Sequence, residues 1–189
     1  MNFSKSIRLL EKAKEIIPVQ SQTFSKSWKY YPFPVSPIYI DHAKGSHVWD
    51  ADGNEFIDFI CGLCPITLGW NYPAVDKAIK KQLKKGITFS LPHPLEIELS
   101  EIICDIIPSA GAVRFMKTGS EACQVAVRIA RAYTGREHIL SFGYHGWHSE
   151  FSVITERPKG IPKSFANYIH EFEYNNIESL EKLFFGYKD

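Results

Sequence analysis

The chain has 189 residues, of which 44% are hydrophobic and 23% charged, and its formal net charge at pH 7 is +1. This composition is typical of a globular protein, and the length is sufficient for one sizeable domain with its own core. The near-neutral charge gives no support for a nucleic-acid partner or a membrane-surface partner, and no apolar run could span a bilayer. Because Glu11 and Glu15 make the N-terminus untypical of a signal peptide, we expect a cytoplasmic protein with reduced thiols.

The first third of the chain predicts a helix, a loop and three strands. Apolar residues recur at helical spacing from Phe3 to Ile17, and Pro18 ends that pattern. Residues 18–37 are rich in Ser, Pro and aromatic residues, which is typical of a loop. Residues 38–41, 46–50 and 55–60 predict short strands, with a turn at 50–53 between the last two. The two aspartates of this turn make a calcium site an alternative interpretation, although the later oxygen ligands of a calcium loop are missing.

Two helices are expected next, and each begins at a proline. Pro73 begins a helix that reaches about Lys85 and has a basic, solvated face. Pro94 begins a second helix, which Pro108 ends. The second helix predicts a buried apolar stripe made of Leu95, Leu99, Ile102, Ile103 and Ile106.

The four cysteines include a pair with the spacing of a redox motif, Cys61 and Cys64. A thioredoxin-like site would need a helix to begin after this pair, and Pro65–Leu68 does not begin one. We interpret the cysteines, which also include Cys104 and Cys123, as small buried thiols, with redox and zinc roles as the alternatives.

The stretch from Ala112 to Gly135 predicts a strand, a tight turn and a helix. Ala112–Lys117 has the character of a short buried strand, and Thr118–Ser120 forms the turn, with Ser120 as the helix N-cap. The helix then runs to about Thr134, and Gly135 ends it. Its expected apolar stripe consists of Ala122, Val125, Ala126, Ile129, Ala130 and Tyr133.

Backbone N–H groups at a helix N-terminus lack partners, so the start of this helix is a candidate site for an anion. The alternative is that Gly119 only forms the turn and Ser120 only caps the helix. His138–Phe142 predicts the next strand, and the loop after it carries Tyr144. Ligands in open α/β sheets lie beyond the carboxyl ends of the strands. A phosphate site after one strand and an aromatic ring after the next would bind a flat, phosphorylated cofactor, for which pyridoxal 5'-phosphate is the candidate.

The rest of the chain adds one more strand and one more helix. Tyr168–Phe172 predicts the strand, and Asn176 can cap a helix from Ile177 to about Phe185. His138, His145 and His148 also leave a metal hydrolase as an alternative. The sequence contains no His-Glu-x-x-His pattern, however, and Gly146 interrupts the spacing of the last two histidines, so we expect no metal.

The chain resembles the class-III pyridoxal-phosphate-dependent aminotransferases, above all the branch that is similar to glutamate-1-semialdehyde aminomutases. The resemblance is carried by Thr118–Ala122, Arg128–Arg136 and Tyr144-His145-Gly146. It extends upstream through Val48–Gly53, Leu68-Gly69, Pro73–Val75 and Glu96–Leu99.

This resemblance implies a fold-type-I α/β transferase, similar to aspartate aminotransferase, in an incomplete form. Residues 1–60 would contribute to a small domain, and residues 61–189 would form the first part of the mixed sheet of the large cofactor domain. The implied activity is amino-group transfer between an amine or amino acid and a carbonyl acceptor, or within one molecule as in a mutase. The implied cofactor is pyridoxal 5'-phosphate, and the implied assembly is a homodimer. Thr118, Gly119 and Ser120 would bind the phosphate, Tyr144 would stack on the ring, and His145 would lie beside it.

The resemblance also implies catalytic residues that the chain does not match. In the family, the lysine that forms a Schiff base with the cofactor and the acid at the pyridine nitrogen lie downstream of the Tyr-His-Gly motif. No lysine after Gly146 lies in a matching context, so we expect an N-terminal part of an aminotransferase that is inactive alone. The alternative is an inactive fragment with only an interaction role.

The expected substrate entrance departs from the aminomutase pattern. Aminomutases have an arginine three residues after a serine of the N-terminal loop, and aligning that serine with Ser21 places Phe24 at the arginine position. Leu63 stands where they have a tryptophan. Because the missing arginine would form a bidentate clamp on a carboxylate, we expect another amino donor or acceptor.

Overall fold

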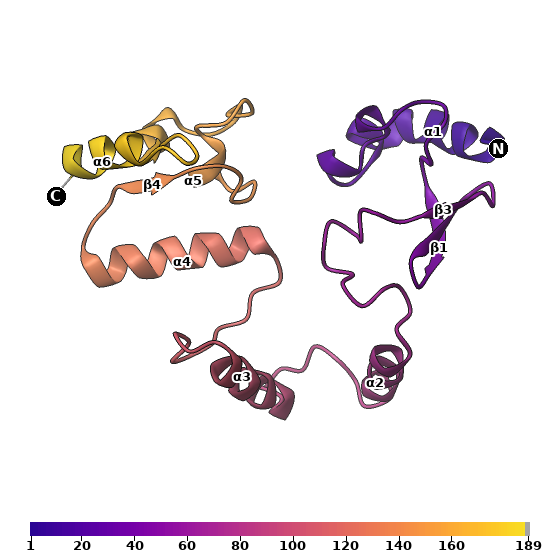
Figure 1. Ribbon diagram of the computed structural model, residues 1–189, viewed down its shortest axis with the longest axis horizontal. Coiled ribbons are helices and arrows are strands. Elements are labelled where there is room, and N and C mark those ends of the chain that lie inside the picture. The colour runs from indigo at the N-terminus through magenta and orange to yellow at the C-terminus, as the bar shows by residue number, and fades with distance from the viewer. Residues whose placement is uncertain (188–189) are drawn as a thin grey trace. The chain divides into compact units, whose positions relative to one another are not determined.

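The computed structural model describes residues 1–187 and divides into two compact units, Met1–Pro92 and His93–Asp189 (Figure 1). The expected boundary near residue 60 between a small and a large domain stays a prediction. Among the described residues, no helix combines the length and the apolar character needed to cross a membrane.

The first unit contains the expected helix, hairpin strands and proline-initiated helix. Strands β1, β2 and β3 form one antiparallel sheet in that order, and Val48 of β2 is buried. The expected loop after the first helix contains three short 3-10 turns, η1, η2 and η3. The bounds in this unit are α1 (Ser4–Ile16), η1 (Pro18–Gln20), η2 (Phe24–Lys26), η3 (Trp28–Tyr30), β1 (Ile40–Lys44), β2 (His47–Asp50), β3 (Glu55–Ile57) and α2 (Pro73–Leu83).

The aspartates of the predicted turn bind backbone N–H groups. The carboxylate of Asp50 is buried and accepts hydrogen bonds from the N–H groups of Asp52 and Asn54 at 3.0 and 2.8 Å. The carboxylate of Asp52 accepts from the N–H groups of Lys5 and Ser6 at 2.6 and 2.8 Å, and so caps α1 from a distant turn. These contacts give both carboxylates a structural role that does not require calcium.

The second unit is an α/β arrangement around a parallel pair of strands. Strands β4 and β5 pair in parallel, with Ile139 opposite Ile169, and the segment between them contains α5 and η4. Ile169 and Phe151 are buried in this unit. The bounds are α3 (Pro94–Ile106), α4 (Gly119–Thr134), β4 (Ile139–Ser141), α5 (Ser149–Ser152), η4 (Lys163–Asn167), β5 (Ile169–Glu171) and α6 (Ile177–Gly186).

Several local predictions in this unit are confirmed. Gly135 has a φ of 69° and lies in the left-handed conformation that ends α4. The side chain of Asn176 accepts a hydrogen bond from the N–H of Ser179 and caps α6 as expected.

Other predictions need correction. Ala112–Lys117 is not a strand, because no neighbouring segment of the described chain pairs with it. The expected buried stripes are largely exposed, as Leu99 and Ile102 of α3 and Ile129 of α4 show. The buried residue of α4 is Val127, which lies outside the predicted stripe. Cys64 is exposed, and Cys61, Cys104 and Cys123 are only partly covered, so the prediction of buried thiols is wrong.

Candidate functional site

The N-terminus of α4 is capped by Thr118, and not by Ser120 as the sequence pattern predicts. The Oγ1 of Thr118 accepts a hydrogen bond from the N–H of Glu121 at 3.2 Å. In return, Oε2 of Glu121 accepts from the N–H groups of Thr118 and Lys117, both at 3.0 Å. This reciprocal arrangement is a capping box, and its sequence signature is a Thr followed three residues later by a Glu.

The capping box reduces the number of backbone N–H groups that are available at the expected anion site. The N–H of Thr118 is already bonded to Glu121, whereas those of Gly119 and Ser120 make no hydrogen bond to another described residue. The space beside Gly119 is open, since a Cβ added there would meet no atom within 4 Å. Two N–H groups at the positive end of a 16-residue helix therefore remain available to an anion.

The aromatic loop, residues 143–148, follows β4 and presents Tyr144 to the surroundings. The side chain of Tyr144 is 82% exposed. His145 is fixed more firmly, because its Nδ1 lies 3.1 Å from the carbonyl oxygen of Gly143 and its ring stacks on Phe151 with centroids 5.1 Å apart. The loop thus combines a free tyrosine ring with an anchored histidine.

The aromatic loop lies directly against the N-terminus of α4. The N–H of Trp147 donates to Oγ of Ser120 at 3.3 Å. Gly146 is so close to Ser120 that an added Cβ would lie 2.7 Å from Cα and would collide with Oγ. Of the predicted cofactor residues, the structure therefore brings Ser120 next to the segment that carries Tyr144 and His145, with Gly146 making the close approach possible.

Further aromatic side chains lie together at the carboxyl ends of the parallel strands, although no sequence motif predicts them as a group. Phe142 follows β4, and its ring lies edge-on to Phe172 with centroids 5.1 Å apart. Tyr174 lies 5.4 Å from the same ring. Since Phe172 and Tyr174 follow β5, only the parallel pairing of the strands could have placed them beside Phe142.

The three residues of the expected substrate entrance all belong to the first unit. The hydroxyl of Ser21 donates to the carbonyl oxygen of Thr23. Phe24 begins η2 and is exposed, and Leu63 is an exposed residue with a φ of 69°. Their part in a substrate entrance stays a prediction.

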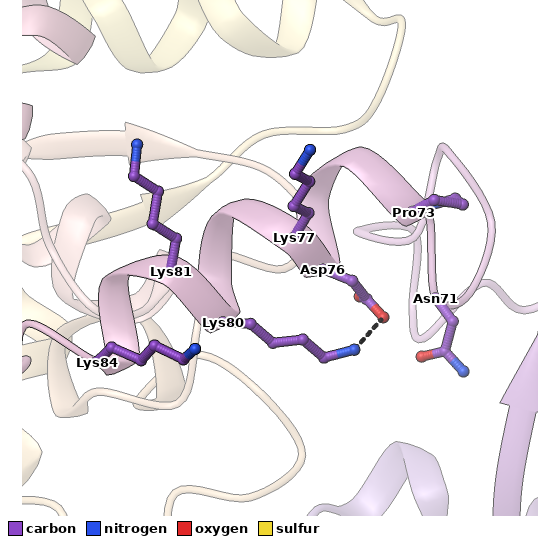
Figure 2. Close-up of a pocket in the computed structure, with 7 residues that line it drawn as sticks. All are labelled: Asn71, Pro73, Asp76, Lys77, Lys80, Lys81 and Lys84. Carbon is purple, nitrogen blue, oxygen red and sulfur yellow. Dashed lines mark ion pairs between the residues drawn. The ribbon is translucent and has the colours of Figure 1, made fainter.

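A separate hollow of about 560 Å³ lies along the basic face of α2 (Figure 2). One ion pair joins its residues, between Lys80 and Asp76 at 3.9 Å, and both side chains reach solvent. Exposed ammonium groups of this kind attract anions only weakly. We therefore do not assign the cofactor site to this hollow, whose lining residues are Asn71, Pro73, Asp76, Lys77, Lys80, Lys81 and Lys84.

The histidines of the metal alternative take part in other contacts. His145 stacks on Phe151, and His148 packs edge-on against Trp147. Nδ1 of His138 faces Nε2 of His170 at 2.9 Å, the distance of a hydrogen bond in which one ring donates and the other accepts. No group of three or more His, Cys, Asp or Glu side chains within residues 1–187 could hold a metal ion.

The contact between His138 and His170 predicts a loss of stability in acid. Burial lowers the pKa of His170, and the charge of His138 lowers that pKa further. Because the folded pKa of His170 is below the unfolded value of about 6.5, the unfolded chain binds more protons than the folded chain between these two pKa values. The free energy of unfolding therefore decreases as the pH falls from about 6.5 through the folded pKa. We expect an NMR titration to give a His170 pKa below about 6.5. In a His138→Asn variant, we expect the pKa of His170 to rise part of the way toward that value. An unchanged pKa in that variant would contradict the coupling.

Comparison with known proteins provides a family for these features. Residues 30–182 match the model of the class-III aminotransferases. The chain is 37% identical to the 3-aminobutyryl-CoA aminotransferase of Cloacimonas acidaminovorans, covering 100% of this chain and 45% of that protein. It is also 37% identical to the glutamate-1-semialdehyde 2,1-aminomutase of Syntrophomonas wolfei, covering 97% of this chain and 45% of the relative.

The structural comparison agrees with these sequence matches. The chain is similar to the structure of a transaminase with pyridoxal phosphate bound, with a TM-score of 0.90 and 28% sequence identity. This match covers 100% of the chain and 46% of the transaminase. The expected α/β transferase fold is therefore confirmed, and the chain spans slightly under half the length of the relatives it matches.

Proposed function

Since this chain belongs to the class-III aminotransferase family, we propose that it supplies the phosphate-binding and ring-covering parts of a pyridoxal-phosphate-dependent enzyme that transfers amino groups. The observation that carries the proposal is the contact between Ser120 at the start of α4 and Gly146 and Trp147 of the aromatic loop. In that contact, a helix end with two N–H groups available to an anion lies beside a loop with an exposed tyrosine ring, which supports the proposal.

The available groups fit the cofactor. Its phosphate would accept hydrogen bonds from the N–H groups of Gly119 and Ser120, with the hydroxyls of Thr118 and Ser120 as further donors. The exposed ring of Tyr144 can cover a flat pyridine ring, and His145 would lie beside that ring. Pyridoxal phosphate supplies an electron-poor ring that stabilises negative charge next to the amine nitrogen. The residues of this chain bind and orient it.

A transaminase is favoured over an aminomutase as the complete activity. Phe24 and Leu63 take positions where the aminomutase pattern has an arginine and a tryptophan, so the carboxylate clamp of that branch is missing. The substrates would be a small amino donor and a small carbonyl acceptor, with Ser21, Phe24 and Leu63 near the entrance.

We infer a cytoplasmic homodimer as the working form of the enzyme. This inference rests on the resemblance, because active sites of the family lie between subunits. Residues 1–60 would then belong to the small domain and residues 61–189 to the large domain.

Replacing Gly119 with aspartate tests the phosphate site. An aspartate in the first turn of a helix favours the helix, and the open space at Gly119 can accommodate the side chain. Its negative charge would repel a phosphate at the same N–H groups. We expect binding of pyridoxal phosphate by the 189-residue chain, measured by equilibrium dialysis, to weaken about tenfold or more. Pyridoxal, which lacks the phosphate, should bind both chains equally.

Ser109→Asp is the matched control, because it adds the same charge at an exposed position of the same unit. Equal binding of pyridoxal and pyridoxal phosphate by the unmodified chain would contradict the phosphate site.

Borohydride reduction should give adducts spread over exposed lysines such as those of α2, and amino donors should not be turned over. A single stoichiometric lysine adduct would show that this chain itself holds the catalytic lysine. A chain without binding would favour the alternative of an interaction role.

A further inference from the structure

Glu150 is a buried acidic residue that the proposed cofactor contacts do not use. It lies in α5 and is 8% exposed. Its two carboxylate oxygens bind two side chains of α4: Oε2 accepts from Nε2 of Gln124, and Oε1 accepts from Nη1 of Arg131. Gln124 and Arg131 are two helical turns apart and lie on one face of α4.

The partners of Glu150 are themselves held in place. Nε of Arg131 donates to the carbonyl oxygen of Glu137 at 2.9 Å, in the connection between α4 and β4. The side chain of Arg131 is mostly covered, so the charge of Glu150 balances a partly buried guanidinium. Removing the carboxylate would leave that guanidinium without its counter-ion, so the contact strongly fixes α5 to α4.

The next residue connects this contact to the aromatic loop. Phe151 is 6% exposed, and its ring stacks on His145, with an angle of 22° between the ring planes. His145 directly follows Tyr144. Residues 150 and 151 therefore hold two parts of the molecule at once, because Glu150 binds the helix and Phe151 holds the loop.

We propose that Glu150 is a positioning residue, which fixes the aromatic loop against α4 and thereby places the Tyr144 ring beside the phosphate-binding end of that helix. This inference rests on the proposed function. Two contacts then attach the aromatic loop to α4. One is made by Ser120 at the first turn of the helix. The other is made through Glu150, which binds Gln124 and Arg131 farther along the helix. Two attachments restrict the loop more than one, so the ring of the cofactor meets a prepared surface.

Glu150→Gln is the first variant, because an amide has only one oxygen and cannot accept from both donors in the way the carboxylate does. One side of the new amide would present an NH₂ group to a donor on α4. The rescue is the double variant Gln124→Glu with Glu150→Gln, which moves the carboxylate to the helix. In that variant the amide donates to the new carboxylate and accepts from Arg131, so all partners are satisfied and the net charge of the wild type is kept.

The measurements are binding of pyridoxal phosphate to the 189-residue chain and amide exchange at Trp147, whose N–H bonds to Ser120. We expect Glu150→Gln to weaken binding about tenfold and to speed exchange at Trp147, with unchanged helical circular dichroism. The double variant should return both values to within about twofold of the wild type. A mere loss of folding would not be reversed by moving the charge.

The outcomes separate this inference from the proposed function. If the wild type binds the cofactor and Glu150→Gln binds it equally well, the positioning role is overturned and the proposed function stands. If the wild type does not bind it, the proposed function fails and the positioning role fails with it. Should Glu150→Gln not fold, Gln124→Ala replaces it, since this variant removes one of the two contacts. Equal binding by Gln124→Ala and the wild type would then overturn the inference.

Discussion

Replacing Gly146 with alanine is expected to separate the aromatic loop from α4 and to weaken binding of pyridoxal phosphate at least tenfold. The added Cβ would collide with Oγ of Ser120 and would lie 2.7 Å from its Cα, and a backbone atom of a helix cannot move aside easily. Gly146 also has a φ of 110°, which an L-residue rarely adopts. Overpacking and backbone strain together cost about 2–5 kcal/mol, so the loop moves away and takes Tyr144 with it.

Gly143→Ala is the matched control for this variant. Gly143 lies in the same loop with a φ of 72°, but a Cβ added there meets no atom within 4 Å. It therefore carries a backbone penalty without the collision with Ser120. Amide exchange at Trp147 and cofactor dialysis should distinguish the two variants. If Gly146→Ala and Gly143→Ala bind the cofactor equally, the contact with Ser120 does not organise the site.

Features that depend on a few adjacent residues could be predicted from the sequence. Gly135 ends α4, Asn176 caps α6, and Pro73 and Pro94 begin helices, because each of these effects acts within one turn of the chain. Thr118-Gly119-Ser120 offers two hydroxyl groups, so the local pattern favours Ser120 as the N-cap of α4, two positions after the residue that caps it. Glu121, three residues after Thr118, was the signal that could have decided between them.

Features that depend on distant partners could not be predicted in this way. Ala112–Lys117 has the composition of a strand, but a strand also needs a neighbour, which no local pattern supplies. Glu150 gave no signal either, since Gln124 and Arg131 lie 26 and 19 residues before it. The aromatic contact of Phe142 with Phe172 depends in the same way on the parallel pairing of β4 and β5.

The candidate site combines local features, which could be predicted, with a contact between distant residues, which could not. A helix start and a loop after a strand, which are local features, predict Ser120 and Tyr144 as cofactor residues, and these roles stay predictions. These local features do not predict the close approach of Gly146 to Ser120, which joins the two segments. An apolar stripe likewise predicts which face of a helix packs against another segment, but it does not predict whether this chain contains that segment.

The exposed stripe of α3 leads to a prediction about association. The side chains of Leu95, Leu99, Ile102 and Ile106 are 48%, 47%, 53% and 71% exposed, although they recur at helical spacing along one helix. Burying half of each side chain would contribute about 1 kcal/mol, or about 4 kcal/mol for the four. An energy of that size corresponds to a factor of about a thousand in an association constant. We therefore expect the purified 189-residue chain to self-associate with rising concentration.

Ile102→Glu should reduce this association about tenfold, as measured by sedimentation velocity over a range of concentrations. The position is exposed and glutamate is a good helix former, so the helix itself should lose little stability. Lys77→Gln on α2 is the control, because it makes the same change in net charge without altering the apolar stripe of α3. If both variants reduce association equally, charge and not the stripe governs it. A wild-type chain that stays monomeric at every concentration and melts cooperatively would show that the exposed apolar side chains do not drive contact between copies.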